Sequence, residues 1–229
     1  MTTDTRAAVA ALASAYTAVT ELVSGLDEAD FARPTGCARW SVDALLFHLT
    51  LDAQRGLMAL AAPGTEPADT DAVSYWRAYA AEADADEGLE ASTARFATHS
   101  AAAYGRPAGL VRHWTHLSAA AVSAAARSDP ELTVATQGLR LGTDDFLQTL
   151  AVEATLHHLD LVRHLTGVPG PPAANLALTR ATLEGLLGVP TPTDWDDRST
   201  ALWLTGREAV PPPDLDRLGP AAGLLPVIR

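Results

Sequence analysis

The chain has 229 residues, of which 16 are basic, 28 are acidic and 48% are hydrophobic, and its formal net charge is −12. This length suits one substantial domain with an extension or two small domains, and the apolar content excludes a largely disordered chain. The acidic balance disfavours nucleic acid and anionic membrane surfaces, which need clustered cations, and the single Cys37 excludes an internal disulfide framework.

Apolar side chains recur at helical spacing along most of the chain. Gly25 ends the first such run, Ser41 is expected to cap the second, and Thr143 or Asp144 is expected to cap the longest. The predicted helices cover about residues 3–24, 41–60, 72–85, 89–104, 110–126, 143–166 and 173–187. The third and fourth of these are either two helices or one broken helix.

Two segments lack the helical pattern. Residues 132–141 fit a short extended piece or a hairpin, and the chain after residue 187 is rich in proline and is expected to be mostly irregular. No apolar run approaches the roughly 20 residues of a membrane-spanning helix, and the N-terminus does not have the pattern of a signal peptide. We therefore expect a cytoplasmic, all-α protein with a helical body over 1–168 and an extension over 169–229 that contains one helix and a Pro-rich tail.

The predicted helix over 143–166 places ionisable side chains on its apolar face. Glu153 and His157 lie one turn apart, about 40° around the helix axis, and Asp160 and His164 continue the same face. A buried carboxylate costs several kcal/mol unless it is compensated, and a metal ion chelated by Glu153 and His157 would compensate it. Because this spacing is common, the alternative is that the two side chains pair with each other or with arginines.

His48 lies within the apolar stripe of the predicted helix over 41–60, with Asp52 and Arg55 following on the same helix. A lone histidine in such a position is usually a core residue, and the other two would be explained by an ion pair worth a few tenths of a kcal/mol. If the two helices are neighbours in a bundle, however, His48 completes a three-ligand site. Asp160 or Asp52 would then accept the distal N–H of a ligating imidazole, with a surface ion pair as the alternative.

Two segments resemble a known family. Residues 35–49, TGCARWSVDALLFHL, are similar to the N-terminal signature of mycothiol-dependent maleylpyruvate isomerase-like proteins, in which a Trp-Ser/Thr-Val segment leads into a helix with the first metal histidine. Residues 146–160 resemble the second signature, in which a glutamate and a histidine supply the remaining ligands. The resemblance implies a DinB-like four-helix bundle with a small helical or α+β extension. It also implies a divalent metal bound by His48, Glu153 and His157, and two imidazoles with one carboxylate are a ligand set typical of catalytic zinc. His158 stands where the family often has arginine.

The same resemblance implies a function. The zinc would activate the thiol of mycothiol for transfer to, or isomerisation of, a small electrophilic substrate. Residues 202–207 resemble the C-terminal part of the family more weakly, and Arg207 is the candidate catalytic and cofactor-binding residue there, with a structural salt bridge as the alternative. His164 is a second candidate for cofactor binding or for the core, and Cys37 is either a nucleophile or a packing residue.

Other functions remain open at this point. A metal-dependent hydrolase would use the same ligands to activate water, because two imidazoles and one carboxylate leave one zinc position open. A non-catalytic protein would bind only a metal or a small molecule. We expect the partners to be a small electrophile and a low-molecular-weight thiol, with no nucleic acid and no membrane, in a monomer or a homodimer.

Overall fold

The computed structural model describes residues 3–78 and 88–228, and this part of the chain is mainly helical. The predicted all-α fold class is confirmed. The α-helices are α1 (Thr3–Ser24), α2 (Val42–Ala61), α4 (Leu89–Ala102), α5 (Pro107–Ala125), α6 (Thr143–Val162), α7 (Ala173–Leu187), α8 (Asp197–Leu204) and α9 (Pro212–Leu218), and the 3-10 helices are η1 (Glu28–Ala32) and η2 (Gly219–Leu224).

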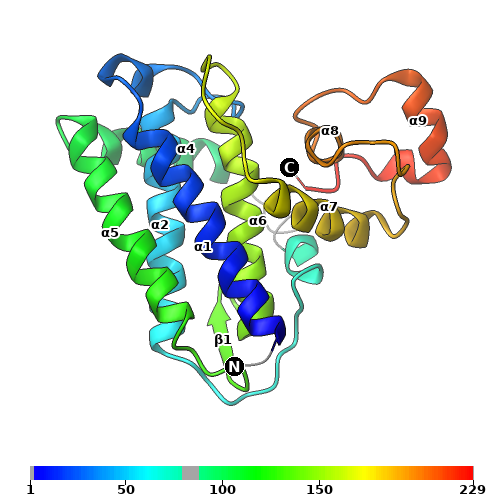
Figure 1. Ribbon diagram of the computed structural model, residues 1–229, viewed down its shortest axis with the longest axis horizontal. Helices are drawn as coiled ribbons and strands as arrows, with labels where there is room; N and C mark the ends of the chain where they lie inside the picture. Colours follow the sequence, from blue (N-terminus) through cyan, green and yellow to red (C-terminus); the bar gives the residue numbers. More distant parts are fainter. Residues whose placement is uncertain (1–2, 79–87, 229) are drawn as a thin grey trace.

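Helices α1, α2, α5 and α6 form a four-helix bundle (Figure 1). Helices α1 and α6 run in one direction and α2 and α5 run in the other, so α2 and α6 are antiparallel neighbours. Large side chains from all four helices are fully buried between them, among them Leu12, Leu45, Leu49, Trp114, Phe146 and Leu150. Antiparallel packing of α2 on α6 matters most here, because the predicted metal ligands lie on these two helices.

Helix α1 is more apolar than the sequence interpretation allowed. Residues Thr5–Ser24 have a hydropathy of 1.4, so by length and composition alone this helix is able to cross a membrane. In the structure its Leu12, Tyr16 and Val19 are buried within the bundle. The core helix of a soluble protein passes the same test, and 39% of this window is buried inside the structure.

Of the predicted N-caps, Ser41 is at the N-cap position of α2, whereas neither Thr143 nor Asp144 is at that of α6. Ser41 occupies the N-cap position of α2, but its hydroxyl donates to the Asp43 carboxylate instead of capping a backbone N–H. Gly142 is the N-cap of α6, and Thr143 is already helical. The Thr143 hydroxyl instead donates to the carbonyl of Leu132, a distance of 2.9 Å. It therefore fastens α6 to the segment before the hairpin.

The predicted hairpin is present. Strands β1 (Thr133–Thr136) and β2 (Leu139–Gly142) are antiparallel, with Thr136 opposite Leu139. The two residues between them, Gln137 and Gly138, both have positive φ, as the tightest hairpin turns require. Of the helix predicted over 72–85, residues 72–73 form a turn and residues 74–78 are helical, and residues 79–85 lie outside the described residues.

The prediction of an irregular tail is wrong. Helices α7, α8 and α9 and the 3-10 helix η2 form a helical extension beside the bundle (Figure 1). Helices α8 and α9 have eight and seven residues, too few for a clear apolar period. Arg180 of α7 holds the connection to α8, because its guanidinium donates to the carbonyls of Trp195 and Pro192 and to the carboxylates of Glu184 and Asp197.

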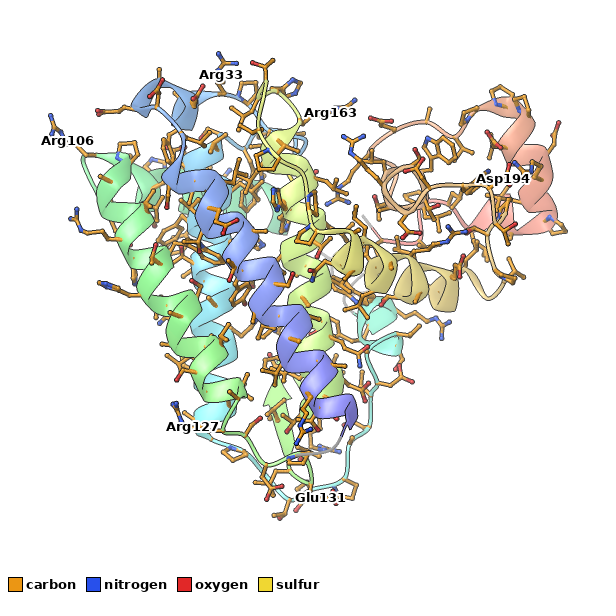
Figure 2. All side chains as sticks on the ribbon, in the orientation of Figure 1. Arg33, Arg106, Arg127, Glu131, Arg163 and Asp194 are labelled. Atoms are coloured by element: carbon orange, nitrogen blue, oxygen red, sulfur yellow. The ribbon has the colours of Figure 1, made fainter. Side chains whose placement is uncertain are left out.

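Charged side chains lie at the ends of these elements, and Arg163 pairs there with Glu208 of the extension (Figure 2). Arg106 and Arg127 flank α5 at its two ends, Arg163 follows the last residue of α6, and Asp194 lies at the outer part of the extension. The ionisable groups of His48, Glu153 and His157 lie instead between α2 and α6.

Candidate metal centre

The structure brings His48, Glu153 and His157 together. Helix α2 carries His48, and its Nε2 lies 3.3 Å from Glu153 Oε1 on α6. Nε2 of His157, one turn further along α6, lies 3.3 Å from the same oxygen. The side chains are only 13–18% exposed, and the two imidazole rings meet edge to face with their centroids 5.0 Å apart. Antiparallel packing of two helices therefore creates the three-residue cluster.

This cluster has the dimensions of a cation site. When metal–ligand distances are about 2.1 Å, neighbouring ligand atoms of a tetrahedral site lie about 3.4 Å apart. The two contacts to Glu153 Oε1 are close to that spacing, and all three ligand atoms lie within 4.8 Å of one another. Two imidazole nitrogens and one carboxylate oxygen are also the protein ligands of known catalytic zinc sites. The residues present therefore fit such an ion.

The pKa shifts in the cluster are also consistent with a cation site. Burial alone would raise the pKa of Glu153, but hydrogen bonds with His157 and His48 hold that pKa well below its usual value. Burial alone would lower the pKa of His157, but hydrogen bonds with Asp160, Cys37 and Glu153 raise it well above the usual value. A proton on His157 thus compensates the buried Glu153 carboxylate in the metal-free protein. A cation would displace this proton on binding.

Asp160 supports the distal side of His157. Its Oδ2 lies 3.0 Å from Nδ1 of His157, the nitrogen that faces away from Glu153. Arg207 of the extension donates to both carboxylate oxygens, with Nε to Oδ1 at 2.9 Å and Nη2 to Oδ2 at 2.8 Å. Burial would raise the pKa of Asp160, but His157 and Arg207 lower it far below its usual value. Asp160 thus has the geometry expected of an acceptor that orients His157, and Arg207 makes the salt bridge that was its alternative role.

The loop before α2 places Cys37 at the same point. The Gly36 N–H donates to the carbonyl of Asp160 over 2.9 Å. The Cys37 thiol donates to Asp160 Oδ2 over 3.1 Å, and its sulfur lies 3.7 Å from Nδ1 of His157. Cys37, His157 and Asp160 are thereby a second group close enough to hold an ion. Arg207 already occupies both oxygens of Asp160, which makes this group the weaker candidate.

Sequence reasoning missed the position of Cys37 beside His157. The sequence contains one signal for this position, because Cys37 lies in the same signature segment, residues 35–49, as the predicted ligand His48. Trp40 from that segment packs edge to face on His48, with ring centroids 5.1 Å apart, and limits the orientation of its imidazole.

Asp52 lies against His48 differently from the sequence expectation. Its Oδ2 is 3.2 Å from Nε2 of His48, the nitrogen that faces Glu153, and not beside the distal nitrogen. Its Oδ1 accepts from Arg55 Nη2 over 3.4 Å. Burial raises the pKa of Asp52, which His48 opposes. The predicted ion pair between Asp52 and Arg55 is present, but it lies at the site and not on a surface.

Two other histidines lie apart from the cluster. Helix α6 ends at Val162, so His164 does not continue the face that carries His157, and the expectation that it does is wrong. His164 is exposed, and its backbone carbonyl accepts from Arg33 over 3.1 Å. His158 is buried, and its Nε2 lies 3.1 Å from the carbonyl of Pro169. His158 thus ties α6 to the segment that leads into the extension.

Comparison with known proteins identifies the family. Residues 12–162 match the mycothiol maleylpyruvate isomerase N-terminal domain, well over half of the chain. The chain therefore belongs to this family, and the predicted resemblance is confirmed. His48, Glu153, His157 and Asp160 lie inside the matched region, and Arg207 lies outside it. No curated protein and no solved structure matches the chain.

Proposed function

We propose that this member of the family binds one divalent cation, zinc, through Nε2 of His48, Oε1 of Glu153 and Nε2 of His157. We further propose that it uses this centre to activate mycothiol toward a small electrophile in the cytoplasm. The observation that carries the proposal is the approach of two imidazole nitrogens to one carboxylate oxygen, 3.3 Å in each case, from two antiparallel helices of the matched domain.

A bound divalent cation with one open position lowers the pKa of a thiol held there, so that the nucleophilic thiolate exists at neutral pH. The chain's own residues prepare that position. Asp160 accepts the Nδ1–H of His157 and thereby turns the lone pair of Nε2 toward Glu153. Trp40 holds the ring of His48 from the side. Such fixed orientations reduce the cost of assembling the site when the thiol arrives.

Arg207 contributes in two ways in this proposal. Its Nε and Nη2 hold the Asp160 carboxylate in place for His157. Its guanidinium is positively charged and only 15% exposed. It also binds an anionic group of the thiol or the substrate in this proposal. The extension thereby completes the site that the bundle begins. His164 is exposed and lies beyond α6, so no contact supports its predicted role in cofactor binding.

Metal content and thiol consumption test the proposal. Protein purified without added metal is expected to contain stoichiometric zinc, and to consume mycothiol only when an epoxide, enone or maleyl compound is present. Turnover at full rate without any thiol would instead indicate a hydrolase that activates water. Protein that neither retains nor takes up zinc would be a non-catalytic binding protein.

The assignment of the ligands has its own variants. His48→Ala, Glu153→Ala and His157→Ala are each expected to lose stoichiometric zinc, because three ligands leave little redundancy. His116→Ala on α5 is the matched control, since this histidine is exposed, and it should retain the metal. Stoichiometric zinc in any two of the three ligand variants would contradict the assignment.

A further inference from the structure

Three donors converge on one oxygen of Asp160. Oδ2 accepts from Arg207 Nη2 over 2.8 Å and from the Cys37 thiol over 3.1 Å, and it lies 3.0 Å from Nδ1 of His157. Because Arg207 holds Asp160 as a carboxylate, the other two contacts need a proton on sulfur and a proton on nitrogen. A carboxylate oxygen has only two lone pairs, and Arg207 uses one of them. The protons of Cys37 and His157 therefore compete for the other.

One cation in place of these two protons would satisfy all three side chains. The Cys37 sulfur lies 3.7 Å from Nδ1 of His157 and 3.1 Å from Asp160 Oδ2, and Nδ1 lies 3.0 Å from that oxygen. An ion about 2.1–2.3 Å from each of these atoms would lie just outside the plane that they define, and such distances are ordinary for metal bonds to oxygen, nitrogen and sulfur. The three ligand atoms are thus close enough together to hold one ion.

Arg207 decides which class of cation suits this group. Its guanidinium donates to both oxygens of Asp160, so the carboxylate is a weak ligand and the sulfur has to supply most of the affinity. Thiolate is a soft ligand that selects thiophilic ions. The side chains of His157 and Asp160 are only 15% and 2% exposed, so the ion would be shielded from water. Two protons leave when one divalent ion enters, and the net charge beside Arg207 does not change.

We propose that Cys37 Sγ, His157 Nδ1 and Asp160 Oδ2 form a second cation site, which takes thiophilic divalent ions such as cadmium. A neutral imidazole has one lone pair, on either Nδ1 or Nε2. An ion on Nδ1 of His157 leaves a proton on Nε2, which lies 3.3 Å from Glu153 Oε1. That proton takes the place of the proposed zinc, so one chain holds an ion at only one of the two sites. The second site stands on its own contacts, and only this exclusion rests on the proposed function.

Cadmium titrated into the purified full-length protein tests the site. A cadmium–thiolate bond gives a charge-transfer band in the ultraviolet, and the sequence has a single cysteine, so the band reports Cys37 alone. We expect one equivalent of cadmium to produce the band in the native protein and in His48→Ala, which lacks the proposed zinc site. Cys37→Ser should lose the band, and His157→Ala should need at least about 10-fold more cadmium. No band in the native protein, or a full band at one equivalent in His157→Ala, would overturn the site.

Crystals of the full-length protein soaked in cadmium chloride identify the ligands without any variant having to fold. We expect cadmium bonded to Cys37 Sγ, His157 Nδ1 and Asp160 Oδ2. Cadmium bonded to Nε2 of His157, with the Cys37 thiol still on Asp160, would overturn the proposal.

The metal content of zinc-loaded protein after desalting tests the exclusion. One equivalent of cadmium should release the zinc from the native protein, whereas Cys37→Ser should keep its zinc under the same conditions. Retention of both ions by the native protein, or equal loss of zinc from both proteins, would overturn the exclusion. Protein that never holds zinc but gives the cadmium band would overturn the proposed function and support the second site.

Discussion

Gly36 offers a sharp test of how the loop before α2 supports the site. A Cβ atom at this position would lie 2.5 Å from Asp160 Oδ1 and 3.1 Å from the Cα of Asp160. The backbone of Gly36 is outside the left-handed region, so the cost of Gly36→Ala is steric. Because the Asp160 backbone belongs to α6, it is the loop or the carboxylate that must move. Either movement weakens the contacts of Asp160 with Arg207 and with the Gly36 N–H.

The magnitude follows from those contacts. Overpacking of a buried site costs about 1–3 kcal/mol, and loss of a hydrogen bond to a charged group costs about 1.5–3 kcal/mol. We expect Gly36→Ala to lower the free energy of unfolding by about 3 kcal/mol, which in a chain of this size lowers the Tm by about 6–12 °C. Zinc affinity should also fall by about 10- to 100-fold, because Asp160 no longer orients His157.

Thermal unfolding followed by circular dichroism, with and without zinc, measures both effects. Gly170→Ala is the matched control, because a Cβ at Gly170 meets nothing within 4 Å and its φ is not positive. That variant should unfold within about 2 °C of the native protein, as surface changes usually do. A Gly36→Ala protein with the Tm and the zinc affinity of the control would refute the argument that close packing of this loop on α6 holds Asp160.

Three further predictions concern Asp160 and the extension. Asp160→Asn should weaken zinc binding by about 10- to 100-fold in chelator competition, and an unchanged affinity would exclude it as the group that orients His157. Arg180→Lys should lower the free energy of unfolding in urea by about 1–3 kcal/mol, because lysine lacks the planar fork that bonds the α7–α8 connection; the exposed Arg198→Lys is its control. Burial alone would raise the pKa of Glu184, but hydrogen bonds with Thr191 and Arg180 lower it. Its stabilising effect is therefore present above its unfolded pKa of about 4.3 and is lost as the pH falls. The Tm difference between the native protein and Glu184→Gln should accordingly narrow from pH 6 to pH 3, and a constant or widening difference would contradict this assignment.

Features that depend on residues close together in the sequence were predicted correctly. Apolar spacing predicted α1, α2, α6 and α7 to within a few residues, and the turn residues predicted the hairpin. Glu153 and His157 are one helical turn apart, so any helix over that segment places them on one face. Their partnership with His48 was predicted because the signature segments resemble a family, since periodicity cannot report contacts between distant segments.

Helix ends and short helices were predicted less well. Helix α6 stops at Val162, before the end predicted at about residue 166, and this removes His164 from the face of the site. Helix α8 carries a readable signal, because the Asp196 side chain accepts from the Ser199 N–H as an N-cap. Helices of this length are stabilised mainly by packing, so their sequences contain little periodic information.

The sequence by itself determined the helical body and the chemical types of the residues that its apolar faces carry. Only the tertiary structure decided which of their atoms meet. Cys37 reaches Asp160 across 123 positions of the chain and Arg207 reaches the same residue across 47, while Asp52 presents an oxygen to the inner nitrogen of His48. The physical reason is that helix periodicity constrains direction around one axis, whereas these distances depend on how separate helices and loops pack against each other.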